Sequence, residues 1–456
     1  MLKRLLRIII GTLLAPAVFA QTNPAITSWL QNTTKTGSYY LSGNSTAISN
    51  GILVNCQQVR YSTDWVYVNT TGIPAYPVGP FTGDGNTNQA GNQNAIFKFP
   101  LNPTINSGTK TATTGGNIGV FINGVAMFDY RDGVAWNATT NALCGGPGRT
   151  GCPTMNQAWN RDAVVAEKLG FDCSKGHPAG TNYHHHQNPS AFKLDLTVVS
   201  TICNLYDADG LYTINTAQHS PLIGFAYDGF PVYGAYGYAK TDGTGGIVRM
   251  KSGYQLRNIT VRTHHADGTD VEDGPAVSAT YPLGYFREDY EWVAHTGDAS
   301  YLDIHNGRFC KTPEYPNGIY CYFATVDARH TSYYPYLIGP TYYGVRNAAK
   351  VASVTETVTT YTKLTPTKEA NLDKLSISIF PNPSSDLLAI QIDDLVKEDY
   401  AIQLYDATGK LVQSAKINTG STIAYFDTQT LYAGTYLVKI SNGSSQTTRK
   451  VVLQKN

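Results

Sequence analysis

The sequence predicts a mainly β protein with few short helices, in which a β-rich body precedes a small C-terminal β-sandwich of the immunoglobulin-like type. Two observations support this fold class. Apolar and polar residues alternate in short runs near the C-terminus, as in 375–379, 388–392 and 436–440, and a period of two is typical of strands with one buried face. The composition agrees, because the chain has 43 glycines and 32 tyrosines but only 15% charged residues, where about 25% is usual.

The N-terminus has the pattern of a secretory signal peptide. Lys3, Arg4 and Arg7 form a basic region, residues 8–18 an apolar run, and 18–20 a small-residue cleavage site. The apolar run is shorter than the roughly 20 residues that a membrane-spanning helix needs. We therefore expect residues 1–20 to be removed and the mature chain to be exported.

Composition also excludes some classes of protein. The net charge of +1 and the lack of a Lys/Arg cluster give no footprint for nucleic acid. Sequence motifs of serine hydrolases, phosphate-binding loops, dinucleotide-binding folds and HExxH metalloproteases do not occur.

Export would place the seven cysteines in an oxidising environment, where thiols tend to pair. We prefer pairs that close short loops. The expected pairs are Cys144 with Cys152, Cys310 with Cys321 and, as a third guess, Cys173 with Cys203, which leaves Cys56 single.

A domain boundary is predicted after Gly344. Residues 345–371 are rich in Thr, Lys, Ala and Val without clustered glycine or aromatic residues, which indicates a linker. The expected organisation is a signal peptide at 1–20, a body at 21–344, this linker, and a C-terminal domain at 372–456.

Histidines carry the strongest functional signal. Five of the ten lie within 43 residues, from His177 to His219. Because side chains two residues apart on a strand share a face, His184 and His186 could hold one ion, while His185 would face away. Neutral imidazole suits copper and zinc, and the Irving–Williams order favours copper. The candidate metal ligands are His177, His184, His186, His219 and, as an oxygen ligand or an acceptor that orients a histidine, Asp228.

Local signals place this cluster. A Thr154/Gln157 capping box and apolar residues at helical spacing from Trp159 to Leu169 predict a helix that ends at Gly170. A Gly/Pro loop carrying His177 follows, and residues 183–186 are predicted to form a strand.

The C-terminal region resembles a known export signal. The residues that carry the resemblance are Phe380-Pro381-Asn382-Pro383, Leu404-Tyr405-Asp406 with Gly409-Lys410, and Leu431-Tyr432-Ala433-Gly434-Thr435-Tyr436. They are similar to the C-terminal sorting domain of the type IX secretion system of Bacteroidota. The resemblance implies engagement with that secretion machinery, passage through the periplasm, and release or attachment at the outer cell surface. The alternative is an immunoglobulin-like binding module on a stalk.

The body resembles the YHYH domain family. The resemblance rests on Gly176-His177-Pro178, on the tetrad 183–186, and on the stretch from His219-Ser220-Pro221 to Tyr233-Gly234, which includes Asp228-Gly229. In this chain the third position of the family's Tyr-His-Tyr-His tetrad is His185, so the outer histidine pair is kept. The resemblance implies no particular reaction.

An internal sequence repeat predicts two related halves. Residues 172–177 align with 303–308, and Tyr183 with Tyr320. The second half lacks the histidines and has Arg308 in place of His177. A metal site is therefore expected in the first half, unless the halves share one pocket.

Two functional hypotheses follow from the sequence. The first is a secreted or surface-attached protein that binds copper or zinc through clustered histidines. The second is a surface binding protein whose tyrosines stack on a glycan or protein partner, with the histidines hydrogen-bonded inside the core.

Overall fold

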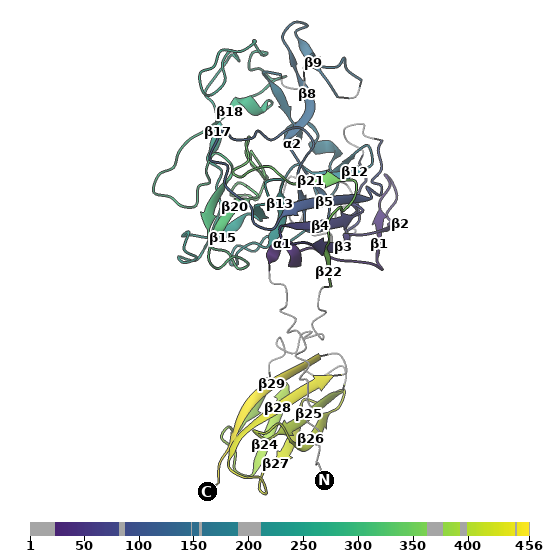
Figure 1. Ribbon diagram of the computed structural model, residues 1–456, viewed down its shortest axis with the longest axis vertical. Coiled ribbons are helices and arrows are strands. Elements are labelled where there is room, and N and C mark those ends of the chain that lie inside the picture. Colours follow the sequence, from purple (N-terminus) through teal and green to yellow (C-terminus); the bar gives the residue numbers. More distant parts are fainter. Residues whose placement is uncertain are drawn as a thin grey trace, which may run out of the picture. The chain divides into compact units, whose positions relative to one another are not determined.

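The computed structural model describes residues 23–81, 87–146, 148–154, 157–189, 211–362, 377–392, 399–442 and 445–455 (Figure 1). The chain divides into two compact units, one ending at Thr362 and one beginning at Lys363. The predicted signal peptide, residues 1–20, and Cys203 lie outside the described residues.

A long mixed sheet forms the centre of the body. Its strands, in spatial order, are β11 (His177–Ala179), β12 (Asn182–His185), β7 (Ala126–Phe128), β6 (Asn117–Phe121), β13 (Leu222–Ala226), β14 (Pro231–Tyr233), β20 (Ile319–Phe323) and β19 (Gly307–Cys310). The pairs β12–β7 and β14–β20 are parallel and the others are antiparallel. The order and directions therefore repeat about the central β6–β13 pair, which confirms the two related halves.

The same side-chain arrangement recurs in both halves. Tyr183 donates a hydrogen bond from its hydroxyl to Asp172 Oδ2 at 2.8 Å, and Tyr320 donates to Asp303 Oδ1 at 2.9 Å. A Cβ added at Gly176 would lie 2.4 Å from the Tyr183 hydroxyl. A Cβ added at Gly307 would lie at the same distance from the Tyr320 hydroxyl. Glycine is needed at this position in each half because the tyrosine ring crosses the backbone there.

A second sheet packs against the first through apolar side chains. Its strand order is β21 (Ala349–Val351), β5 (Ala95–Pro100), β4 (Trp65–Thr70), β3 (Cys56–Tyr61) and β22 (Thr359–Tyr361). Trp29, which follows α1 (Pro24–Thr27), lies between the sheets, with ring centroids 5.6 Å from Phe99 on β5 and 5.3 Å from Phe225 on β13. The main core of the body therefore lies between these two sheets.

The predicted linker was wrong over residues 349–361. This segment forms β21 and β22, which pair with β5 and β3 at the two edges of the second sheet. Its threonines, valines and tyrosine suit strands, and the sheet edges offer unpaired backbone groups. Absence of glycine and of clustered aromatic residues therefore does not distinguish a linker from edge strands.

The body also contains smaller sheets. They are β10 (Asn160–Asp162), β8 (Arg131–Asn137) and β9 (Ala142–Cys144); β1 (Thr36–Tyr39) with β2 (Ile48–Leu53); β15 (Tyr236–Tyr238) with β16 (Ile247–Arg249); and β17 (Tyr254–Leu256) with β18 (Tyr290–Trp292). A 3-10 turn, η3 (Arg287–Asp289), precedes β18.

The helix predicted before Gly170 is much shorter than expected. Residues 160–162 pair with β8 instead, so the helix α2 spans only Ala163–Ala166 and is followed by the 3-10 turn η1 (Lys168–Gly170). Asp162, rather than Thr154, caps α2 by accepting from the Val164 amide at 2.8 Å. Trp159 is fully buried, as a core residue should be.

Cysteine pairing was predicted in part. Cys144 and Cys152 form a disulfide, and Cys173 is also disulfide-bonded. Cys310 and Cys321 are free thiols, so that expected pair was wrong. Cys310 lies opposite Ile319, and Cys321 lies opposite Arg308, so the two cysteines are diagonal neighbours. Their side chains are close enough to hydrogen-bond to each other, but they form no disulfide.

The C-terminal unit is a β-sandwich with its own core. One sheet has the order β23 (Ile377–Phe380), β24 (Leu387–Ile392) and β27 (Ile423–Asp427), and the other has the order β26 (Leu411–Ile417), β25 (Tyr400–Tyr405), β28 (Gly434–Asn442) and β29 (Ser445–Leu453). Alternate residues such as Ile402, Leu404, Val438 and Ile440 are buried. The period-two pattern thus forms the core as predicted.

Candidate metal centre

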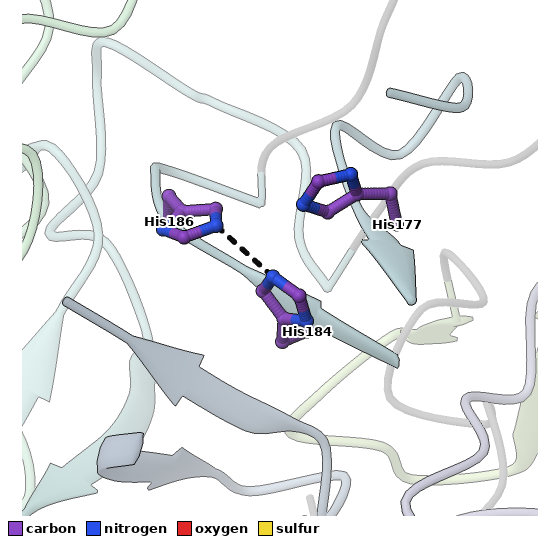
Figure 2. A group of neighbouring side chains, drawn as sticks. All are labelled: His177, His184 and His186. Carbon is purple, nitrogen blue, oxygen red and sulfur yellow. Dashed lines mark hydrogen bonds between the residues drawn. The ribbon is translucent and has the colours of Figure 1, made fainter. Parts of the chain in front are cut away.

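Three histidines meet on the β11–β12 hairpin at one end of the long sheet. Antiparallel pairing places His177 on β11 opposite His184 on β12, and His186 follows two residues later on the same face. One ring nitrogen from each histidine can be chosen so that all three lie within 4.8 Å of one another (Figure 2). His185 points to the other face, where its Nε2 lies 2.8 Å from the Tyr76 hydroxyl. The predicted alternation along 184–186 is confirmed.

Backbone carbonyls determine which nitrogens face the centre. His184 Nδ1 lies 2.9 Å from the Asn182 carbonyl oxygen, and His186 Nδ1 contacts the Asp129 carbonyl oxygen. A carbonyl only accepts, so each Nδ1 carries the proton and each Nε2 keeps its lone pair. The two Nε2 atoms nevertheless lie only 3.0 Å apart, an arrangement of two facing acceptors.

Glu167 completes the cluster. Its Oε2 lies 3.3 Å from His177 Nε2 and 3.4 Å from His186 Nε2. Glu167 is the residue directly after α2, so the short helix and the turn η1 position it. Burial alone would raise the pKa of this carboxyl group, but the contacts with His177 and His186 outweigh burial and lower it to about 2. Glu167 is therefore an anion facing the imidazoles.

Glu167 was not among the ligands predicted from the sequence. It lies ten residues before His177 in a segment predicted to be a longer helix, and no motif marks it. Gly170 and Gly176 separate it from the histidine loop, so nothing in the local sequence connects the two.

Aromatic rings exclude water from the cluster. Phe128 stacks on His184 with ring centroids 3.7 Å apart, and Phe171 packs edge-on against His177 at 4.9 Å. His177, His184 and His186 are only 4%, 1% and 3% exposed. Burial first, and then repulsion from His186 and His177, holds the pKa of His184 well below its usual value. His184 is thus uncharged, and its Nε2 can offer a lone pair to a metal ion.

His219 and Asp228, the other two predicted ligands, lie elsewhere. His219 packs against Tyr233 on β14 at 5.2 Å and contacts the Ser220 carbonyl oxygen through Nδ1. Four strand spacings separate β12 from β14, which is roughly 19 Å. Proximity in the sequence does not bring these two residues to the cluster, because β13 and β14 begin the second half of the sheet.

Asp228 has a structural environment. Its carboxylate accepts hydrogen bonds from the Tyr322 hydroxyl at 2.6 Å and the Gly344 amide at 2.8 Å. Burial raises its pKa to about 6. It stands in the tight turn between β13 and β14, where Gly229 has a φ of +86°.

The second half has no equivalent cluster among the described residues. The positions that match His177, His184 and His186 are Arg308, Cys321 and Phe323. Arg308 donates to the carbonyl oxygens of Ala299 and Tyr238. Of the described residues, His177, His184 and His186 form the one group of three or more ligand-type side chains close enough to hold an ion.

The fold and the cluster define a mainly β protein with a buried histidine-carboxylate centre. Residues 96–334, just over half of the chain, match the YHYH protein family. The chain therefore belongs to that family. Residues 378–454 match the secretion system C-terminal sorting domain, so the protein is secreted or surface-located and is exported through the periplasm.

Other comparisons show only slight likenesses. Dimeric latent PorU from Porphyromonas gingivalis is 21% identical with a TM-score of 0.16, over 18% of this chain and 9% of that chain. A duf3244 family protein with an immunoglobulin-like beta-sandwich fold from Bacteroides vulgatus is 22% identical with a TM-score of 0.16, over 18% of this chain and 86% of that chain. This chain thus spans less than a tenth of PorU. No curated protein matches significantly.

Within the described ranges, no helix is long and apolar enough to span a membrane.

Proposed function

We propose that this YHYH protein binds one transition-metal ion outside the cell, through His177, His184, His186 and Glu167. The observation that carries the proposal is the 3.0 Å approach of His184 Nε2 to His186 Nε2, when both Nδ1 atoms face carbonyl oxygens. A proton on one Nε2 would relieve a single contact. An ion accepts lone pairs from both nitrogens and from the carboxylate at once.

The donor set favours copper or zinc. Three neutral imidazoles and one carboxylate supply three nitrogens and one oxygen, which suits these borderline metals. By the Irving–Williams order the same donors bind Cu(II) more tightly than Zn(II). With a dication, the net charge of the site is +1, and burial favours the fewest unpaired charges. Four protein ligands fill a tetrahedral shell, so we infer binding or storage of the ion rather than metal-centred catalysis.

The backbone contacts support preorganised binding. Ligand histidines in proteins usually donate their other ring N–H to a carbonyl or carboxylate, which fixes the tautomer and the ring orientation. His184 and His186 both have such an acceptor before any ion is present. The alternative of a tyrosine-based binding surface has less support, because many tyrosines lie in the core. Tyr130 and Tyr334, for example, are both buried and pack with ring centroids 5.2 Å apart.

Metal analysis tests the proposal. The mature protein, prepared without a histidine tag and dialysed against equimolar Cu(II) and Zn(II), should retain one equivalent of metal, chiefly copper. Its Cu(II) spin-resonance spectrum should show nitrogen coupling. His184→Ala with His186→Ala should lose the metal. The matched control is His264→Ala with His295→Ala, because both histidines are exposed, and it should retain the full equivalent.

Folding must be checked in parallel. All five tryptophans lie at or before residue 292, so their fluorescence reports the fold of the body in the full chain. If the double variant unfolds, His177→Gln provides the second test, since β11 is an edge strand of the sheet. A folded variant of either kind that still binds one equivalent with unchanged affinity would refute the proposal.

A further inference from the structure

A cavity of about 290 Å³ opens beside the metal centre, between the α2–η1 segment and the residues around 331–336. Phe171 lines it, and the same ring packs against His177. Gln187, directly after His186, lines it too. The cavity is therefore next to the histidine cluster and shares the Phe171 ring with it.

Two lysines line the cavity. Lys168 is half-buried, and Lys175 is only 3% exposed and has other contacts within the protein. Asp172 is the one acid among the lining residues. Its carboxylate already accepts from the Tyr183 hydroxyl at 2.8 Å and from the Gly79, Ser174 and Gly176 amides at 3.0, 2.9 and 3.1 Å. Asp172 is thus committed to the fold, and the ammonium group of Lys168 is the charge that the cavity offers to a ligand.

Other nearby acids are also engaged. Asp162 accepts from the Tyr336 hydroxyl at 2.8 Å and caps α2. Glu167 faces the histidines. No carboxylate next to the cavity is therefore placed to neutralise Lys168, for which the described residues provide no ion pair.

The remaining walls are apolar or aromatic and carry one unsatisfied polar atom. Val164, Val165, Tyr290 and Tyr334 are among the lining residues. Ser332 Oγ is buried and has no hydrogen-bond partner. A buried hydroxyl without a partner costs about 1–3 kcal/mol, so it marks a place where a polar atom of a ligand, or a water molecule, would be stabilised.

The backbone at this cavity is strained. Tyr336 lines it with a φ of +69°, and His330, directly before the lining residue Thr331, has a φ of +65°. Such conformations cost of order 1 kcal/mol or more for residues other than glycine, and they gather at binding sites.

We propose that this cavity binds a small organic anion, a monocarboxylate with an apolar or aromatic body. The carboxylate would pair with Lys168, and the body would contact the valines and the tyrosines that line the cavity. A volume of about 290 Å³ is at the lower end of ligand cavities, which restricts the ligand to roughly the size of one ring. The site does not depend on the metal, because none of its lining residues is a proposed metal ligand.

The test uses benzoate and its uncharged isostere benzamide on the full mature chain, metal-free and copper-loaded. Saturation-transfer NMR and calorimetric titration should give a benzoate Kd on the order of 1 mM, as expected for so small a ligand. Benzamide should bind at least about tenfold more weakly, because a charge-assisted contact is replaced by a neutral one. Hexanoate and hexanamide extend the comparison to an aliphatic body.

Variants locate the site. Lys168→Met keeps the apolar stem of the side chain and removes the charge, so it should weaken benzoate binding about tenfold and leave benzamide binding unchanged. Val164→Trp should fill the cavity and abolish binding of both. Lys350→Met is the matched control, because Lys350 lines a different cavity beside β21, and it should bind benzoate like the wild type.

Three results would overturn the proposal. One is that neither carboxylate binds at about 10 mM, ten times the expected Kd. Another is that each acid and its amide bind equally well. The last is that Lys168→Met and Lys350→Met alter benzoate binding to the same extent. Failure of metal binding would leave all three readouts unaffected, because they are also measured on metal-free protein.

Discussion

Replacing His185 with tyrosine should remove a specific loss of stability in acid. His185 lies on the face of β12 opposite the metal centre, is 1% exposed, and contacts the Tyr76 hydroxyl. Its counterpart in the second half is Tyr322, on β20, so the same sheet position accepts a tyrosine there. Burial, the largest cause, lowers the pKa of His185 to about 3.

The size of the effect follows from that pKa. In the unfolded chain His185 titrates near 6.5, so below pH 6.5 the unfolded state binds a proton that the folded state does not. The folded pKa is depressed, and the free energy of unfolding therefore falls as pH falls from 6.5 towards 3. At pH 5, which is about 1.5 units below the pKa of the unfolded state, His185 lowers the free energy of unfolding by about 2 kcal/mol. Tyrosine does not titrate in this range.

Urea unfolding of the metal-free protein measures this difference. Tryptophan fluorescence follows the body alone, since all five tryptophans lie at or before residue 292. Between pH 7.5 and pH 5, wild type should lose about 2 kcal/mol more unfolding free energy than His185→Tyr. The reasoning would be refuted if both proteins lost the same amount, because His185 would then titrate alike in the folded and unfolded states.

Two further predictions concern the metal centre and the boundary of the body. Glu167→Gln should keep the shape of the side chain but lower Cu(II) or Zn(II) affinity by roughly 100-fold or more, because an anionic ligand becomes neutral. Competition titration with a chelator measures this affinity. An unchanged affinity would remove Glu167 from the ligand set. A chain ending at Thr362 should unfold at the same urea concentration as the body of the full protein and should keep its metal. A chain ending at Gly344 should unfold at a lower urea concentration, because it lacks β21, β22 and the buried Ala348. Equal unfolding midpoints for the two truncations would contradict this boundary.

Local patterns accounted for much of this protein. Strand alternation follows from covalent geometry, so a spacing of two was enough to place His184 and His186 on one face and His185 on the other. The repeated Asp-to-Tyr segment was readable for the same reason, since each copy encodes its own hairpin and its own Tyr-to-Asp hydrogen bond. Period-two runs likewise predicted the C-terminal sandwich.

Only the tertiary structure decided which residues complete the metal centre. His219 and Asp228 follow the cluster in the sequence, but strand order assigns them to the other half of the sheet, several strands away. Glu167 joins the cluster because residues 160–162 pair with β8, which shortens the helix to one turn and turns the next side chain towards His177. Strand order and pairing between distant segments depend on packing over the whole body, and no local spacing in the chain encodes them.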